Sequence, residues 1–239
     1  MNTSYFFAAL SVVTIIGGTG YANDFSGIYT EIVVGPAQGT HVLSYQHDGL
    51  NVSGDLYTLK IKGSVFGATL GYRHQLFSSP VYLGVEFTGH MGGLDASEHW
   101  EDSYHTPYGN VGAALDVSYS VDALYTATVQ VGYQFHESWL LYAGLGASAA
   151  DTQVCGTVTV YAGPHSANYD DCTEGYAVGP YGEVGIKYKS PDQNWMIGLE
   201  FQQYKYAATE EFNYHEYDLG SLTAVADHWA VAMTFGYQF

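Results

Sequence analysis

Basic residues are scarce in this sequence of 239 residues. Lys and Arg number 6 against 24 Asp and Glu, which gives a formal net charge of −18. Nucleic-acid binding requires clustered basic side chains that displace counterions from phosphates, so we expect no nucleic-acid partner. Charged residues make up only 13%, about half the usual share for a soluble domain. Hydrophobic residues make up 47%, which is too many for a disordered acidic chain.

Long hydrophobic runs are also missing. The apolar run Tyr5–Ile16 is shorter than the roughly 20 residues that a transmembrane helix needs. The small residues Gly20 and Ala22 follow it, as they do before a signal-peptide cleavage site, although no Lys or Arg precedes the run. We therefore expect a signal peptide over residues 1–22 and an exported domain over residues 23–239. The alternative is a buried N-terminal helix.

An alternation with a period of two is the main pattern of the exported part. Every odd position from Leu115 to Phe135 is apolar or aromatic, and most even positions are polar or small. This pattern predicts a strand with one apolar face, longer than strands of soluble sheets usually are. In the last segment the expected inward residues are small or polar, which suits a narrow lumen better than the core of a soluble sandwich. They are Ala230, Ala232, Thr234, Gly236 and Gln238.

Eight segments show this kind of alternation, and the connections between them are alternately short and long. Short turns on one side and long loops on the other are typical of an outer-membrane barrel. The predicted fold is therefore all-β, an eight-stranded antiparallel up-and-down transmembrane β-barrel. The expected strands are 25–34, 59–74, 81–94, 114–135, 140–153, 176–189, 195–208 and 227–239. The expected long loops are 35–58, 95–113, 154–175 and 209–226.

Two details of this topology have alternatives. Ten strands would result if the first or second long loop contained a further hairpin. In the second segment, Leu59 and Ile61 have the opposite parity to Phe66, Leu70 and their alternating neighbours. A β-bulge near Gly63 would bring all of these side chains to the outer face.

Short signatures carry a resemblance to a known family. Aromatic residues alternate at Phe235, Tyr237 and Phe239, and Gly-Tyr followed by a polar residue precedes short turns at 71–73 and 132–134. Together these features resemble the small outer-membrane barrel family that includes the OmpA transmembrane domain, opacity-type proteins and porin family proteins. The resemblance implies a Gram-negative outer membrane, with lipid or lipopolysaccharide around the barrel. It also implies that the terminal aromatic residues are read by the barrel-assembly machinery.

Charged residues at inward positions form the first candidate site. A carboxylate that faced lipid would be costly, so inward placement is expected. One interpretation is a charged constriction or proton path. The favoured one is a salt-bridge and hydrogen-bond network that fills an eight-stranded barrel, whose interior is about as wide as its side chains. The expected inward set is Glu31, Arg73, Glu86, Asp116, Asp122, Glu183, Lys187, Lys189 and Glu200.

Catalysis is a weaker candidate. The spacing His136-x-Ser138 resembles lipid A deacylases, small barrels with a Ser/His/Glu triad. Those enzymes have an acid about a dozen residues after the serine, where this chain has Ala150 and then Asp151. His136 and Ser138 also fall in a turn expected on the periplasmic side, away from lipid A. We therefore expect no catalytic residues and no cofactor.

The long loops are acidic and rich in tyrosine. Imidazole and carboxylate groups can bind Zn²⁺ or Ca²⁺, but none of their spacings here matches a defined ligand loop. A solvated acidic surface is the favoured interpretation, and no metal is expected. The groups are Glu98, His99, Glu101, Asp102 and His105 in one loop, Asp170, Asp171 and Glu174 in another, and Glu210, Glu211, His215, Glu216 and Asp218 in the last.

Cysteine is nearly absent, with two residues that bracket one long loop. Since the periplasm is oxidising, Cys155 and Cys172 are expected to form a disulfide; free thiols or a metal pair are the alternatives. The sequence as a whole predicts a non-enzymatic outer-membrane protein with a structural or adhesive role. A host or surface ligand would bind its long loops. The rival function is a narrow, cation-preferring pore for small solutes, and a more remote one is a lipid A-modifying enzyme.

Overall fold

The computed structural model describes residues 24–47, 52–77, 79–106, 109–162, 165–214 and 217–239. The signal peptide expected over residues 1–22 lies outside this part of the chain. No helix in the described residues is long and apolar enough to cross a membrane.

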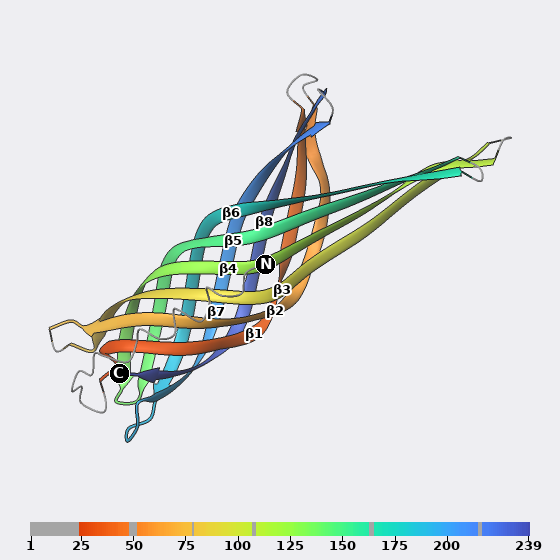
Figure 1. The fold of residues 1–239 in the computed structure, drawn as a ribbon. Coiled ribbons are helices and arrows are strands. Elements are labelled where there is room, and N and C mark those ends of the chain that lie inside the picture. The colour runs from red at the N-terminus through yellow and green to blue at the C-terminus, as the bar shows by residue number, and fades with distance from the viewer. Residues whose placement is uncertain (1–23, 48–51, 78, 107–108, 163–164, 215–216) are drawn as a thin grey trace, which may run out of the picture.

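Eight antiparallel strands pair in chain order, and the last pairs with the first, which closes a barrel (Figure 1). The prediction of eight strands is confirmed. The strands are β1 (Gly27–His47), β2 (Val52–Gln75), β3 (Val81–Thr106), β4 (Gly109–His136), β5 (Trp139–Ala162), β6 (His165–Lys189), β7 (Trp195–Tyr214) and β8 (Tyr217–Gln238).

The strands are far longer than predicted. A tilted membrane strand needs about 9–11 residues, whereas β4 has 28 and β7 has 20. Much of the sequence that was expected to form long loops continues the strands instead. Those segments have no lipid on one side, so they need no strict apolar alternation to keep their backbone ladders.

Beyond the membrane the barrel divides into two arms (Figure 1), one built from β3 to β6 and the other from β7, β8, β1 and β2. Pairing of β2 with β3 ends at Lys62–Asp95, and pairing of β6 with β7 ends at Val178–Ala207. We call one arm the acidic arm; it comprises residues 95–106, 109–122, 151–162 and 165–177 of β3 to β6. The second arm comprises residues 38–47, 52–62, 207–214 and 217–227.

A proline marks one of the seams where the arms separate. On β6, Val178 and Tyr181 pair with β7, whereas neither Gly179 nor Pro180 has a β7 partner among the described residues. Proline has no backbone N–H to donate to a neighbouring strand. The ladder between β6 and β7 therefore loses a rung just below the point where it ends.

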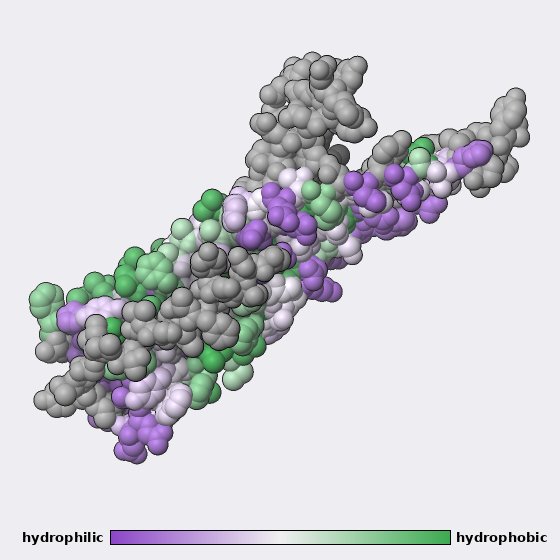
Figure 2. Space-filling model, viewed as in Figure 1, coloured by the Kyte–Doolittle hydropathy of each residue, from purple (hydrophilic) through white to green (hydrophobic). Residues whose placement is uncertain are grey.

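The outer face of the barrel is apolar, as a lipid-facing surface must be. Figure 2 shows hydrophobic side chains gathered on the barrel and hydrophilic ones along the acidic arm. At the short-turn end, Trp195 stacks on Phe235 with ring centroids 4.9 Å apart and meets Tyr237 edge-on. Trp139 packs on Tyr188 nearby. These contacts form the aromatic girdle typical of a membrane interface.

Two predictions about side-chain orientation are wrong. Leu59 and Ile61 are fully buried inside the barrel, and β1 and β2 keep one register past Gly63, so no bulge lies there. On β4 the register shifts between Val121 and Ala123, so odd residues below this point face lipid and odd residues above it, such as Val121, face inward.

Candidate functional site

A layer of buried charge fills the half of the lumen nearer the short turns. Lys187 is at its centre and donates a hydrogen bond from Nζ to Glu31 Oε2 at 2.6 Å. The same Nζ lies 3.3 Å from Glu200 Oε1 and 3.9 Å from Glu86 Oε2. The side chain of Lys187 has no exposed surface. One ammonium group thus binds three carboxylates that come from β1, β3 and β7.

Arg73 on β2 and Gln130 on β4 connect this cluster to Glu183 on β6. Arg73 donates from Nε to Gln130 Oε1 at 3.1 Å, and its guanidinium lies 3.9 Å from the centre of the Tyr29 ring. Gln130 in turn donates from Nε2 to Glu86 at 2.8 Å and to Glu183 at 2.6 Å. The polar residues of this layer therefore form one cross-linked network, as an eight-stranded interior should.

Small residues on neighbouring strands make room for these long side chains. A Cβ atom added to Gly236 would lie 2.4 Å from Glu31 Cγ, and one added to Gly144 would lie 2.5 Å from Glu183 Oε1. Gly236 belongs to the inward set predicted for the last segment, all of whose members face the lumen. The small side chains of β8 thus give space to acids from other strands, and the lumen is filled.

A second, mainly apolar layer fills the lumen on the side of the arms. Tyr204 lies at the boundary: it donates to Gln202 Oε1 at 2.7 Å, its hydroxyl lies 3.2 Å from His90 Nε2, and its ring stacks on His228. This layer was not predicted, since Leu59, Ile61, Tyr119 and Val121 were assigned to the lipid-facing side. It includes Leu59, Ile61, Val65, Leu94, Tyr119, Val121, Leu124 and Tyr206.

The start of the described chain closes the short-turn end. Phe25 is fully buried against Tyr82, and this cluster also contains Tyr29, Leu140 and Met196. Tyr82 donates to Gln134 at 2.7 Å. Lys189, a predicted inward residue, donates to the Asp24 carbonyl oxygen. The lumen is therefore filled at both ends as well as in its middle.

Most of the predicted inward charges are where they were expected. Glu31, Arg73, Glu86, Glu183, Lys187 and Glu200 are buried in the polar layer. Asp116 and Asp122 are exposed on the outer face instead, because the register shift at Asp122 inverts the alternation above it. Tyr29, Gln130 and Tyr142 complete the network. The same alternation places them inward, but they are uncharged and so do not belong to the predicted set of inward charges.

No catalytic triad forms around His136 and Ser138. The Ser138 amide donates to His136 Nδ1 at 3.3 Å, so this nitrogen is already occupied by backbone. Asp151 lies on β5 twelve residues beyond Trp139, roughly 40 Å along an extended strand. The spacing that suggested a nucleophile therefore brings no acid near it.

The acidic segments lie on both arms: those of β3 and β6 belong to the acidic arm, whereas Glu210, Glu211 and Asp218 belong to the second arm. Among the described residues, no group of three or more His, Cys, Asp or Glu side chains could hold a metal ion. His215 and Glu216 lie outside the described part. His99 Nδ1 lies 2.6 Å from Asp116 Oδ1, and this hydrogen bond raises the pKa of the exposed His99 above its ordinary value.

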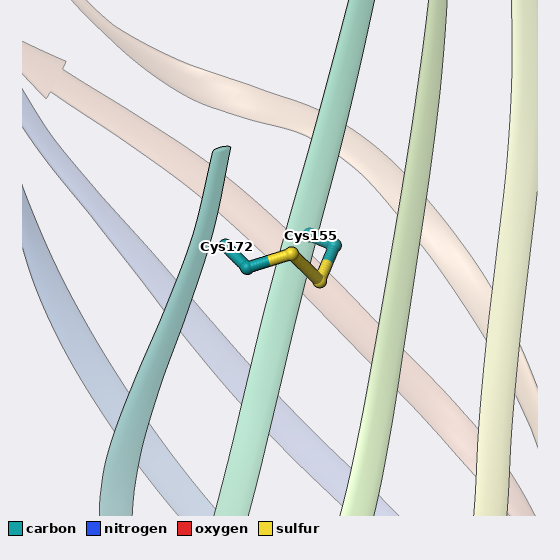
Figure 3. The surroundings of a disulfide bond; sticks show 2 residues. All are labelled: Cys155 and Cys172. Carbon is teal, nitrogen blue, oxygen red and sulfur yellow. A yellow bond between two sulfur atoms is a disulfide. The ribbon is translucent and has the colours of Figure 1, made fainter. Parts of the chain in front are cut away.

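Cys155 on β5 and Cys172 on β6 form a disulfide, as predicted (Figure 3). The two residues are directly paired in the β5–β6 ladder, with Cα atoms 4.1 Å apart. They lie within the acidic arm rather than at the ends of a loop.

The family model for the outer membrane protein beta-barrel domain matches residues 7–226. No curated protein matches the chain in sequence. Ail, the attachment invasion locus protein of Yersinia pestis, was solved with the heparin analogue sucrose octasulfate. It is 15% identical over 89% of this chain and 99% of its own, with a TM-score of 0.36.

Two further solved structures are also similar to this chain. The outer membrane protein OprG from Pseudomonas aeruginosa is 15% identical over 90% of this chain and 96% of its own, with a TM-score of 0.45. The outer membrane protease OmpT from Escherichia coli is 10% identical over 89% of this chain and 97% of its own, with a TM-score of 0.42.

Proposed function

Because this chain belongs to the outer membrane protein beta-barrel family, we propose that it is a closed, non-enzymatic barrel that carries binding surfaces outside the outer membrane. Its role would be adhesion to a host or surface ligand, or envelope integrity. The observation that supports this proposal most is the filled lumen. Lys187, Arg73 and their carboxylate partners occupy one half and the apolar layer occupies the other.

Planar-bilayer recording on the refolded protein tests this proposal. We expect no large, persistent openings, because open porins use about 16 strands to leave a water channel. Liposomes that contain the protein should also exclude sugar-sized solutes. Sustained conductance, or uptake of such solutes, would refute a closed barrel.

A narrow, cation-preferring pore is the second candidate. One observation favours it: the polar layer contains the carboxylates of Glu31, Glu86, Glu183 and Glu200 but only two cations, Arg73 and Lys187. Carboxylates in excess would select cations if water entered the lumen. Small openings whose reversal potential follows the cation gradient would support this function.

The aromatic residues of β8 support a proposal about biogenesis. Phe235 and Tyr237 are on the outer face, and Tyr237 packs edge-on against Phe239. These residues would be recognised by the barrel-assembly machinery after export. Phe239→Ala should lower the amount of protein in the outer membrane of cells while refolding in detergent stays near normal; equal amounts in cells would contradict this role.

A further inference from the structure

Strand β6 has a long free edge outside the membrane. From His165 to Tyr188 it pairs with β5 without a register shift, but its pairing with β7 ends at Val178. Residues 165–177 therefore have a partner strand on one side only, among the residues that the structure describes. Figure 1 shows this edge of the acidic arm diverging from the second arm. Such an edge is a template for another strand.

The disulfide identifies the backbone groups that point to this edge. In an antiparallel pair, Cα atoms are about 4.5 Å apart where the residues share no hydrogen bond and about 5.5 Å apart where they do. The 4.1 Å between Cys155 and Cys172 marks a pair without hydrogen bonds, so the N–H and C=O of Cys172 point away from β5.

Side-chain hydrogen bonds give the same orientation independently. Thr152 and Ser148 of β5 donate to the carbonyl oxygens of Gly175 and Gly179, so the odd residues of β6 direct their carbonyls toward β5. Since the register is constant, the even residues direct their N–H and C=O groups to the free edge. In the exposed part these include Asn168, Asp170, Cys172 and Glu174.

The side chains of these same residues give the edge its charge. Asn168, Asp170, Cys172 and Glu174 are exposed. The segments of the acidic arm contain no Lys or Arg, and residues 165–177 contain no proline. Edge strands usually avoid pairing through lysine, proline or a bulge. Here like charges would oppose a second copy of this chain, whereas a basic segment would be attracted.

We propose that the free edge of β6 binds an extended, basic segment of a partner protein as an additional antiparallel strand. This inference rests on the proposed surface-binding function and names the chemistry of its partner. Residues opposite Asp170 and Glu174 have side chains on the same face, so the partner places Lys or Arg at two positions four residues apart. The disulfide holds β6 on β5 and keeps this edge in place before binding.

The test uses the full-length protein in lipid nanodiscs and a fluorescent synthetic peptide, Thr-Lys-Thr-Val-Thr-Lys-Thr, observed by anisotropy. A second peptide has the same sequence with N-methyl groups on the amides that would face β6. It keeps the charge but cannot form the ladder, so it should bind at least about tenfold more weakly. A third peptide, with Glu in place of both Lys residues, should not bind measurably.

Matched variants assign binding to this edge. Asp170→Asn with Glu174→Gln should weaken binding about tenfold, since two charge pairs are lost. Asp95→Asn with Glu98→Gln removes the same charge from β3, at the other edge of the acidic arm, and should leave the affinity unchanged. Asn168→Pro removes an edge-facing N–H without removing a bond to β5 and should also weaken binding.

Each result decides the proposal independently of whether the barrel conducts. Weaker binding of the N-methylated peptide, together with sensitivity to the edge variants alone, supports it. Equal binding of the N-methylated peptide, or an equal effect of the control variants, would show general electrostatic attraction and overturn it. No binding by the wild-type protein would also overturn it, as would dimers that pair through this edge in sedimentation.

Discussion

Lys187 shows how one residue can secure the interior of a barrel. Its ammonium group is fully buried and contacts Glu31 and Glu200 within 3.3 Å. Lys187→Met should lower the free energy of unfolding by about 3–5 kcal/mol, because carboxylates would remain buried without their cation. Urea titration of the protein folded in lipid vesicles measures this loss. Lys205→Met, at an exposed position, is the control, and an equal effect there would contradict the argument.

His99 gives the arm a pH-dependent contact. The hydrogen bond to Asp116 raises the pKa of His99, so the charged pair is complete at pH below the ordinary histidine range. The pair is lost as pH rises through the raised value. In Asp116→Asn the pKa of His99, followed by NMR, should fall toward its ordinary value. Asp122→Asn is the control; an unchanged His99 pKa in Asp116→Asn would contradict the contact.

At the scale of strands, alternation predicts orientation only while the register is constant. The last segment was predicted correctly throughout because β8 pairs with β1 without a shift over these residues. On β4 the extra residue at Asp122 inverts the faces, and the sequence contains no glycine there to suggest a bulge. For Leu59 and Ile61 the prediction failed for another reason: it assumed that apolar side chains face lipid, whereas the upper lumen is itself apolar.

The disulfide should stabilise the acidic arm and have little effect on the barrel. It closes a loop of 17 residues in sequence separation, for which the chain-entropy model gives about 3 kcal/mol. In Cys155→Ala with Cys172→Ala, hydrogen exchange should therefore speed up in residues 156–171. Exchange in the membrane part of β5, from Trp139 to Ala149, should stay slow and serves as the internal control. Free thiols in protein alkylated directly in the envelope would contradict the disulfide.

At the scale of the whole molecule, two layers of side chains fill the lumen in series. Tyr29 lies in the polar layer and Tyr204 at the start of the apolar layer, and both are fully buried. Tyr29→Ala or Tyr204→Ala alone should leave the barrel closed in bilayer recordings, because one layer remains. The double variant should show small, cation-selective currents, since the carboxylates remain. Equal currents from either single variant would show that the layers do not act separately.

The sequence predicted the membrane half of the molecule far better than the outer half. In the bilayer, lipid on one side forces a strict alternation, and strand count, inward charges such as Glu31, and connectivity follow from it. Beyond the apolar layer the arms meet no lipid, so the same backbone ladder forms without that pattern. Residues 95–106, 109–113, 154–162 and 165–175 therefore resemble loops in sequence although they pair as strands.

The closing seam between β1 and β8 has a consequence for the order of folding. Its bonds join residues about as distant in sequence as the chain allows: Phe239 donates its N–H to the carbonyl oxygen of Ile28. The β3–β4 and β5–β6 hairpins pair residues that are close in sequence. Because distant contacts require the costlier loop closure, hairpins form early and ring closure comes last. Until then β1 and β8 both have open edges, so the unclosed sheet is the state most exposed to aggregation.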